Sequence, residues 1–185
     1  MFLVELQMEG NSFLATPRQR LSFSATRTEK NWSPFIWNGE VCFIYSIFPF
    51  RPVQLVGNGF CYLIPSRAPP VRWRWGELRG GTQAIQISDQ EYITFFHSSR
   101  SDYGSVRYFM GALTFLSGSS FSITGISKEP IVGRGFYSTE ERPREIIYPG
   151  GVVADGEFFY VSYGKDDHEV WIAKLDRQKL LDQLK

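Results

Sequence analysis

The chain has 185 residues with 20 basic and 19 acidic side chains, and its formal net charge of +1 excludes an overall field that would recruit nucleic acid or an anionic membrane. No run approaches the roughly 20 apolar residues of a membrane span, and residues 2–8 are too short for the apolar core of a signal peptide. We therefore expect a cytoplasmic, single-domain protein, with no nucleic acid and no membrane among its partners.

Aromatic residues make up 16% of the chain, which also holds 17 Gly and 10 Pro, a composition typical of an all-β protein with many short strands and turns. Cys42 and Cys61 lie within apolar strand patterns, and neither their spacing nor the two histidines indicate metal ligands. The sequence therefore predicts buried thiols in a reducing compartment, no metal site and no cofactor.

Turn pairs and apolar alternation predict hairpins in the first third of the chain. Asn38-Gly39 stands between two apolar segments and predicts a two-residue turn, because both central residues of such a turn need positive φ. The Gly-Asn-Gly triplet at 57–59 predicts a second turn. The strands expected here are residues 2–8, 21–26, 34–37, 41–47, 51–56 and 60–64.

Residues 71–75 (VRWRW) predict a half-exposed strand, with core or interface packing of Trp73 and Trp75 favoured over a sugar platform or a nucleic-acid surface. Gly80-Gly81 precedes the next strand and predicts a close backbone approach rather than a phosphate loop. The other strands expected in this part are residues 83–87, 91–97, 106–116 and 121–126.

The C-terminal part predicts a strand, a tight turn at Asp155-Gly156, a strand at 158–163, a charged loop at 164–168 and a last strand at 170–175. Polar groups gathered at one strand end are where a β scaffold usually presents a site. Leucines with helical spacing then predict a short helix at about 176–184.

Three segments repeat a turn-type pair, a Glu and an apolar strand: WNGEVCFIYS, SDQEYITFFHS and ADGEFFYVSYG. Their spacing of roughly 50 and then roughly 65 residues lies in the range of propeller blades. The sequence thus predicts an all-β partial propeller of about three four-stranded blades. The blades are expected at about residues 21–66, 71–127 and 145–175.

Five motifs carry a resemblance to a known family: TEKNWSPF, RGGTQAIQI, ITFFHSS, YFMGALTF, and YPGGVV followed by VSYGKDDHEVWIAKLD. In this order they resemble the C-terminal blades of the five-bladed β-propellers of the β-mannoside phosphorylase family, which comprises glycoside phosphorylases and related hydrolases (glycoside hydrolase family 130). The resemblance covers nearly the whole chain after about residue 20. It implies that the N-terminal half of such a propeller is lacking.

The resemblance also implies ligand-binding residues. The Lys of the EKNW motif is Lys30, which in the phosphorylases helps to hold the attacking phosphate, a role that suits an ammonium group. His97 matches the His that ends the FFH strand and faces the central cavity, and Asp167 matches the acidic residue that contacts sugar hydroxyls. The possible pocket-wall residues are Trp32, Arg79, Tyr108 and Asp166.

Each of these residues also has a structural interpretation. Lys30 suits a solvated loop, and His97 suits a core histidine whose polar atoms are bonded. Asp166 and Asp167 suit a turn, because Asp side chains bond their own backbone there.

Two departures from the family pattern bear on activity. RGGTQA replaces the more usual SGGTPP, so Arg79 and Gln83 are expected to alter the pocket wall. The family's catalytic Asp and most of its phosphate-binding Arg residues lie in the N-terminal half, and no acidic residue here matches that Asp by motif. The loop carboxylates that remain as replacements are Asp102, Asp166 and Glu169.

The sequence leaves three functions open. The chain is a carbohydrate-binding or vestigial glycosidase-like protein that recognises a glycan or sugar phosphate, a β-mannoside phosphorylase or hydrolase, or a structural module. Because three blades cannot close a ring and open blades expose apolar faces, the chain is either an open wedge or, as we prefer, a homo-oligomer whose copies cover these faces. In the phosphorylase or hydrolase alternative, this association completes the active site.

Overall fold

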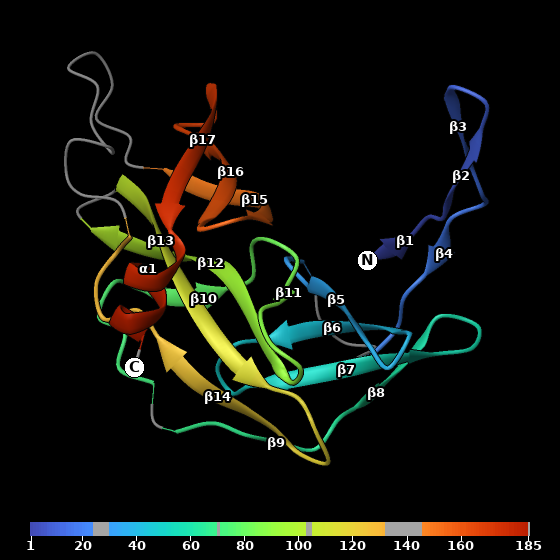
Figure 1. Cartoon of the computed structure of the whole chain (residues 1–185), viewed down its shortest axis with the longest axis horizontal. Helices are drawn as coiled ribbons and strands as arrows, with labels where there is room; N and C mark the ends of the chain where they lie inside the picture. Colours follow the sequence, from blue (N-terminus) through green and yellow to red (C-terminus); the bar gives the residue numbers. More distant parts are fainter. Residues whose placement is uncertain (24–29, 70, 103–104, 132–145, 185) are drawn as a thin grey trace.

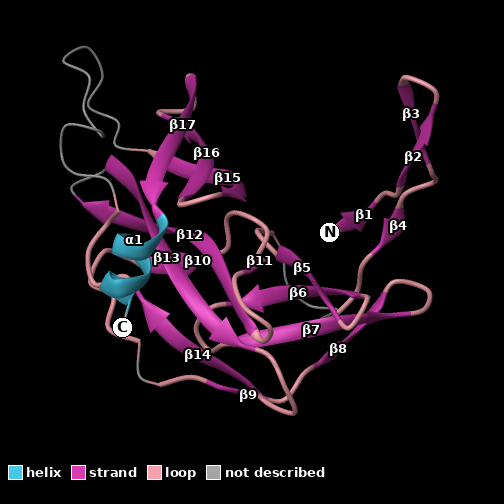
Figure 2. Ribbon diagram, viewed as in Figure 1, coloured by secondary structure: helices cyan, strands magenta, loops and turns pink. Residues whose placement is uncertain are grey.

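The computed structural model describes residues 1–23, 30–69, 71–102, 105–131 and 146–184. Strands make up most of this part of the chain, and its one helix, α1 (Arg177–Leu184), follows the last strand (Figure 2). Three main sheets and a narrow N-terminal arm can be followed in Figure 1. The predicted all-β fold with a short C-terminal helix is therefore confirmed.

The first sheet contains four antiparallel strands in chain order: β5 (Ser33–Trp37), β6 (Glu40–Ser46), β7 (Arg51–Val56) and β8 (Phe60–Leu63). Asn38 and Gly39 join the first two strands with φ angles of 51° and 80°. Both residues are in the left-handed region, which Asn and Gly enter at the lowest cost. The hairpin predicted from this pair is confirmed.

The second sheet contains β9 (Ser66–Arg67), β10 (Glu77–Arg79), β11 (Ile85–Gln86), β12 (Glu91–Asp102), β13 (Ser105–Leu116) and β14 (Phe121–Ile126). The order is β10-β12-β13-β14-β9, and β11 pairs with the start of β12. Alternate residues of β12 enter different cores: Tyr92 and Phe96 pack toward the first sheet, Ile93 and Phe95 toward the third. Both faces of this sheet are therefore buried.

The third sheet is an antiparallel meander of β15 (Ile147–Asp155), β16 (Phe158–Lys165) and β17 (Glu169–Asp176). Its first turn consists of Gly156 and Glu157, one residue later than predicted, and Gly156 alone has positive φ (56°). The predicted pair of positive φ angles at Asp155-Gly156 is wrong because Gly occupies the first central position of the turn, where it meets the need for positive φ.

Hydrogen bonds join the three sheets in chain order. The Ala84 N–H donates to the Pro34 carbonyl at 2.8 Å, between the second and first sheets. The Gln83 amide donates to the Val152 carbonyl at 2.7 Å and accepts from the Val152 N–H at 3.3 Å, between the second and third. Sheets that follow one another along the chain and pack face to face fit a propeller-like fold. The number of blades and their boundaries stay predictions.

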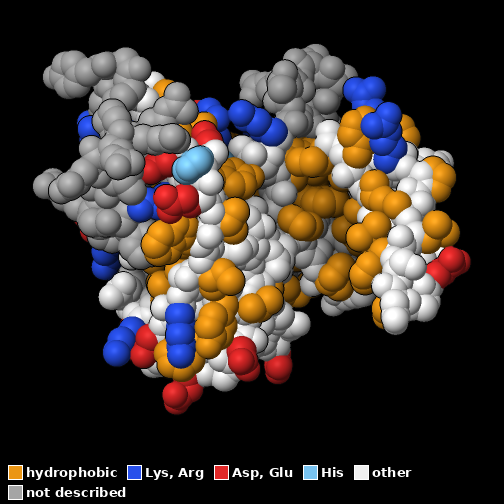
Figure 3. All heavy atoms as spheres, turned by 90° about the horizontal axis from the view of Figure 1, so that it is seen from above, with side chains coloured by type: hydrophobic (Ala, Val, Ile, Leu, Met, Phe, Trp, Pro, Cys, Tyr) orange, Lys and Arg blue, Asp and Glu red, His pale blue; other side chains and the backbone are white. Residues whose placement is uncertain are grey.

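The N-terminal arm consists of two small antiparallel pairs, β1 (Phe2–Leu3) with β4 (Gln19–Arg20), and β2 (Leu6–Glu9) with β3 (Ser12–Ala15). It projects from the three sheets (Figure 1). Its apolar side chains are exposed, Met8 to 73%, and hydrophobic side chains gather there in Figure 3. The predicted strand at 2–8 is therefore split in two, and both parts lie outside the main sheets.

The arm is attached at Leu21 and Ser22. Leu21 is buried, and Ser22 forms a parallel bridge with Phe60 at the edge of the first sheet. Residues 24–26 of the predicted strand at 21–26 lie outside the described residues. A Cβ at Gly59 would meet the Arg20 carbonyl oxygen at 2.1 Å, so glycine lets the arm pass close to the first sheet.

The predicted strand at residues 71–75 is wrong, because residues 71–74 are irregular and the nearby strand is β10. Side-chain packing rather than a strand ladder orders this segment. The Trp73 ring lies edge-on to Phe96 and the Trp75 ring lies near Phe109, each with centroids 5.0 Å apart. The packing interpretation of both tryptophans is confirmed.

The C-terminal helix packs onto the second and third sheets through Leu180 and Leu184, which are buried. Its N-terminus is capped by Asp176, whose Oδ1 accepts a bond from the Lys179 N–H at 2.9 Å. That backbone bond lowers the pKa of Asp176. The cap explains why the helix begins directly after β17.

Candidate functional site

A pocket of about 430 Å³ lies where the first sheet meets the second, and we name it the seam pocket. It is formed by the residues before β5, the connection between β6 and β7, and β10 with the glycine that follows it. Its volume falls in the range of small-molecule sites. The side chains that matter for its chemistry are those of Lys30, Trp32, Phe48, Arg51, Glu77 and Arg79.

The charge of the seam pocket is mainly positive, because Lys30, Arg51 and Arg79 line it with a single carboxylate, Glu77. The Arg79 Nη2 donates to Glu77 Oε2 at 2.8 Å. Among the described residues, no ion pair neutralises the other two cations. The pocket therefore offers an ammonium and a guanidinium to an anionic ligand.

Two glycines bring the sheets together at this pocket. A Cβ at Gly80 would lie 2.1 Å from the Asn31 carbonyl oxygen, and a Cβ at Gly81 would lie 2.7 Å from Pro149 Cγ. Such distances are too short for any side chain, so only glycine allows the first and third sheets to approach this point. The close backbone approach predicted from the Gly80-Gly81 pair is confirmed.

His97 lies directly behind the seam pocket and is 1% exposed. Its Nδ1 is 2.7 Å from the Gly80 carbonyl oxygen and must carry the proton, because a carbonyl oxygen only accepts. Burial, helped by the charges of Arg79 and Lys30, lowers the pKa of His97 to about 4. The imidazole is therefore neutral at pH 7 and supports the backbone next to Arg79.

The low pKa of His97 predicts a stability change below pH 6.5. The folded state takes up the proton near pH 4 and the unfolded state near 6.5, so the unfolded state holds more protons between these values. The stability provided by the neutral imidazole is complete above pH 6.5 and is lost as the pH falls toward 4, by about 3 kcal/mol at most. Urea unfolding of the wild type and His97→Gln between pH 7.5 and 4 measures it.

The expected result is that the difference in unfolding free energy between wild type and His97→Gln shrinks steadily with acidification. The Gln variant serves as the control, because it retains an amide donor and does not titrate. Parallel pH curves for the two proteins would show that protonation of His97 does not contribute.

Two tyrosines flank His97, Tyr108 from the second sheet and Tyr148 from the third. The His97 ring centroid lies 5.2 Å from that of Tyr108 and 4.8 Å from that of Tyr148. The Tyr148 hydroxyl donates to Asn31 Oδ1 at 3.4 Å, and burial raises the pKa of Tyr148. Asn31, just before β5, thus meets residues of the second and third sheets next to Lys30.

The structure brings five of the predicted site residues together. Lys30, Trp32 and Arg79 line the seam pocket, and His97 lies behind it with Tyr108 at its side. Trp32 is 6% exposed and packs edge-on against Phe43 and Tyr45, so it also has a structural role. Gln83 was expected in the pocket wall but bonds to Val152 between the sheets instead.

Asp166 and Asp167 form the turn after β16, with φ angles of 54° and 55°. Asp166 is buried; its Oδ1 accepts from the Ile146 N–H at 3.0 Å and its own N–H donates to the Ile146 carbonyl at 2.8 Å. These bonds hold the turn against Ile146, next to β15, which is a structural role for Asp166, and its place in a pocket wall stays a prediction. Asp167 is exposed and outside the lining of the seam pocket, so its sugar contact stays a prediction.

Of the replacement carboxylates whose side chains the structure describes, neither Asp166 nor Glu169 lines the seam pocket. Asp166 is held by the backbone, Glu169 accepts a bond from Trp171 Nε1 at 2.6 Å, and the side chain of Asp102 lies outside the described residues. The carboxylate that does line the pocket, Glu77, was missed by sequence analysis, and its Oε2 is bonded to Arg79.

Sequence analysis also missed Arg51, Asn31 and Tyr148. Asn31 and Tyr148 stand inside the EKNW and YPGG motifs, which could have indicated them. Arg51 starts β7 and has no motif around it, so tertiary packing alone brings it to the pocket.

Other predictions concern thiols, metals and membranes. Cys42 and Cys61 are both buried, as predicted, and burial raises the pKa of Cys42 to about 11. Within the described ranges, no group of three His, Cys, Asp or Glu side chains is placed to hold a metal ion. The one helix in this part of the chain, α1, does not have the length and apolar character to cross a bilayer.

Comparison with known proteins gives one similar curated sequence. A stretch of 89 residues is 30% identical to β-mannosyltransferase 3 of Candida albicans, covering 46% of this chain and 16% of that protein. No family model matches the chain.

Solved structures match over much more of the chain. The β-1,2-mannobiose phosphorylase of Listeria innocua, in complex with β-1,2-mannobiose, superposes with a TM-score of 0.61 at 15% identity, covering 84% of this chain and 46% of that one. A glycosyl hydrolase of Bacteroides ovatus gives 0.54 at 15% identity, covering 81% and 49%. The chain thus has the fold of the β-mannoside phosphorylases and related glycoside hydrolases, over about half of the length of these proteins.

Proposed function

We propose that this chain is a carbohydrate-binding, glycosidase-like protein that takes a phosphate, free or on a sugar, in the seam pocket. The observation that carries the proposal is the convergence of Lys30, Arg51 and Arg79 on one pocket of about 430 Å³. Hydrogen bonds to charged groups are stronger than neutral ones, so three cations favour an anion over a neutral ligand. A phosphorylase among the solved structures of similar fold supports phosphate as that anion.

Each residue has a distinct role in this proposal. Lys30 provides a point charge on a flexible stem, and Arg51 can bind two phosphate oxygens with its planar fork. Arg79 already donates one N–H to Glu77, which fixes the orientation of its guanidinium. His97 is a positioning residue: its bond to the Gly80 carbonyl holds the backbone that presents Arg79.

Among the described residues that line the seam pocket, no carboxylic acid is free of a bonding partner, which favours binding over catalysis. Glu77 is the carboxylate among the described lining residues, and its Oε2 already accepts a bond from Arg79 at 2.8 Å. Glycoside cleavage needs a protonated acid near the scissile bond. The described part of the chain thus favours a ligand-holding role for the pocket.

Calorimetric titration of the full chain with inorganic phosphate and with mannose 1-phosphate tests the proposal. Loss of two charged donors should weaken binding of both anions at least about tenfold in a Lys30→Ala, Arg79→Ala variant. Mannose itself should be insensitive to that double substitution. The matched control is Arg72→Ala with Lys128→Ala, which removes two positive charges outside the pocket.

The control variant should bind both anions as the wild type does. If the two double variants lose affinity equally, the effect is one of net charge and the site is not the seam pocket. If the wild type binds neither anion, the phosphate proposal is wrong and the structural-module alternative gains support.

A second candidate is a β-mannoside phosphorylase or hydrolase whose site is completed when copies associate. One observation favours it: a face of the third sheet presents apolar side chains to solvent, with Val170 86% and Ile172 68% exposed. Such a face suits a protein contact. Release of mannose or mannose 1-phosphate from β-mannosides by an assembly heavier than one chain would establish this candidate.

A further inference from the structure

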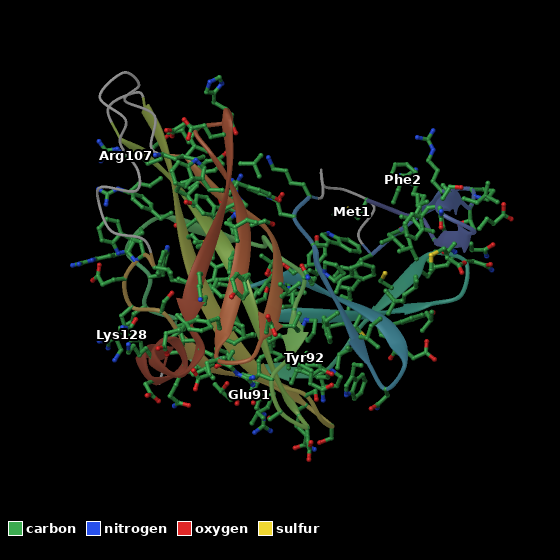
Figure 4. The ribbon with its side chains drawn as sticks, turned by 45° about the horizontal axis from the view of Figure 1, so that its top comes forward. Met1, Phe2, Glu91, Tyr92, Arg107 and Lys128 are labelled. Atoms are coloured by element: carbon green, nitrogen blue, oxygen red, sulfur yellow. The ribbon has the colours of Figure 1, made fainter. Side chains whose placement is uncertain are left out.

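A second and larger pocket, of about 610 Å³, lies at the opposite end of β5 from the seam pocket. One wall contains Trp37 and the Asn38-Gly39 turn of the first sheet, and the other contains β11 and the start of β12. Figure 4 places Tyr92, which lines this pocket, at the far end of the long β12–β13 hairpin from Arg107. We name it the turn pocket.

The turn pocket differs from the seam pocket in charge. The described residues that line it include no Lys or Arg, and Asp89 is their one carboxylate. The amides of Asn38, Gln86 and Gln90 provide both donors and acceptors. A lining without cations does not suit phosphate, and one rich in amides does not suit a lipid. It suits a neutral ligand with many hydroxyl groups.

An aromatic side chain adds a surface for the apolar face of such a ligand. Trp37 is half-buried, and its ring meets Phe121 edge-on at 5.0 Å and 81°. This contact fixes the orientation of the indole at the pocket wall. Indole rings combine a large apolar surface with one polar N–H, which matches the mixed faces of a sugar ring.

Hydrogen bonds to the backbone hold the walls of the turn pocket in place. The Tyr92 hydroxyl donates to the Ile36 carbonyl at 2.9 Å and joins the two sheets. Gln86 Nε2 donates to the Asp89 carbonyl at 2.8 Å, and the Ser117 N–H donates to the Gln90 carbonyl at 2.8 Å. These bonds order the loop backbone, while the side chains of Asp89 and Gln90 are exposed.

We propose that the turn pocket binds an uncharged saccharide of one or two units. Its volume lies within the roughly 300–1,000 Å³ of typical ligand sites. This inference does not depend on the proposed phosphate site, since the two pockets share no lining residue and differ in charge. A protein with both pockets would hold a neutral glycan unit at one end of β5 and an anion at the other.

The test is a titration of the 15N-labelled full chain with mannose, glucose and β-1,2-mannobiose, in which NMR chemical shifts of the backbone amides report binding. At least one sugar should shift residues 36–39, 86–92 and 117–118. The variant Asp89→Ala, Gln90→Ala should weaken this binding at least about tenfold, because it removes two hydrogen-bonding side chains while keeping the backbone bonds. Trp37→Phe, which keeps an aromatic ring against Phe121, should weaken it less.

The control is the Lys30→Ala, Arg79→Ala variant, in which binding at the turn pocket should be unchanged. The inference is overturned if about 10 mM sugar shifts none of these residues, since that would fill most of a site with a Kd of about 1 mM. It is equally overturned if all sugar-induced shifts cluster at the seam pocket and disappear in the control variant. That second result would leave the phosphate proposal intact.

Discussion

Replacing Gly80 with alanine is expected to lower the free energy of unfolding by about 3 kcal/mol and to weaken anion binding at the seam pocket. The new Cβ would lie 2.1 Å from the Asn31 carbonyl oxygen and 2.7 Å from Ser33 Oγ. The Asn31 oxygen belongs to the backbone and cannot rotate away, so the first and second sheets must separate. For a chain of this length the expected drop in Tm is roughly 6–12 °C.

Thermal unfolding, monitored by circular dichroism, measures the stability of Gly80→Ala, and calorimetric titration measures its affinity for phosphate. The matched control is Gly150→Ala, because the nearest atoms to a Cβ there lie at 3.9 Å. That control should change stability by less than about 0.5 kcal/mol. Equal losses in both variants would mean that the short contacts at Gly80 are not the cause of the loss, because the entropy change of a Gly→Ala substitution by itself favours the folded state.

Replacing Phe95 with alanine is expected to cost about 3–5 kcal/mol, the largest stability effect that we predict. Phe95 is fully buried on the face of β12 that packs against the third sheet, with its ring 6.2 Å from that of Phe159. Truncation leaves a cavity between two sheets, and neither sheet can close it without losing its other contacts. Urea unfolding at pH 7.5 gives the change directly.

The matched control for Phe95 is Phe13→Ala, which removes the same atoms from the arm, where Phe13 is 68% exposed. It should have little effect on stability. A loss below about 1 kcal/mol for Phe95→Ala would mean that the interface of the second and third sheets adds little to folding.

Sequence reasoning succeeded where a local pattern determines the backbone. Asn38-Gly39 forms the predicted turn because its φ angles depend on these two residues alone. The Gly80-Gly81 pair was recognised because a glycine pair before a strand marks close approach. At residues 71–75 the same approach failed, because the alternation of Trp73 and Trp75 reflects packing on a sheet rather than membership of one.

The candidate site was predicted only in part, because a sequence pattern indicates a local motif but not which distant segments lie together in the fold. Lys30 and His97 stand in motifs that the family resemblance could match. Arg51 and Glu77 have no motif, and they reach the pocket because the β6–β7 connection and β10 lie together in the folded chain. Asp166 was ambiguous in the sequence, and its two bonds to Ile146 favour the backbone-stabilising interpretation.

The seam pocket belongs to neither sheet alone, since Asn31 provides one wall and Gly80 the other. A ligand that contacts both walls would hold the two sheets together, so its binding would raise the free energy of unfolding. A substitution in these two walls would therefore change the affinity for the ligand and the stability of the ligand-bound chain together.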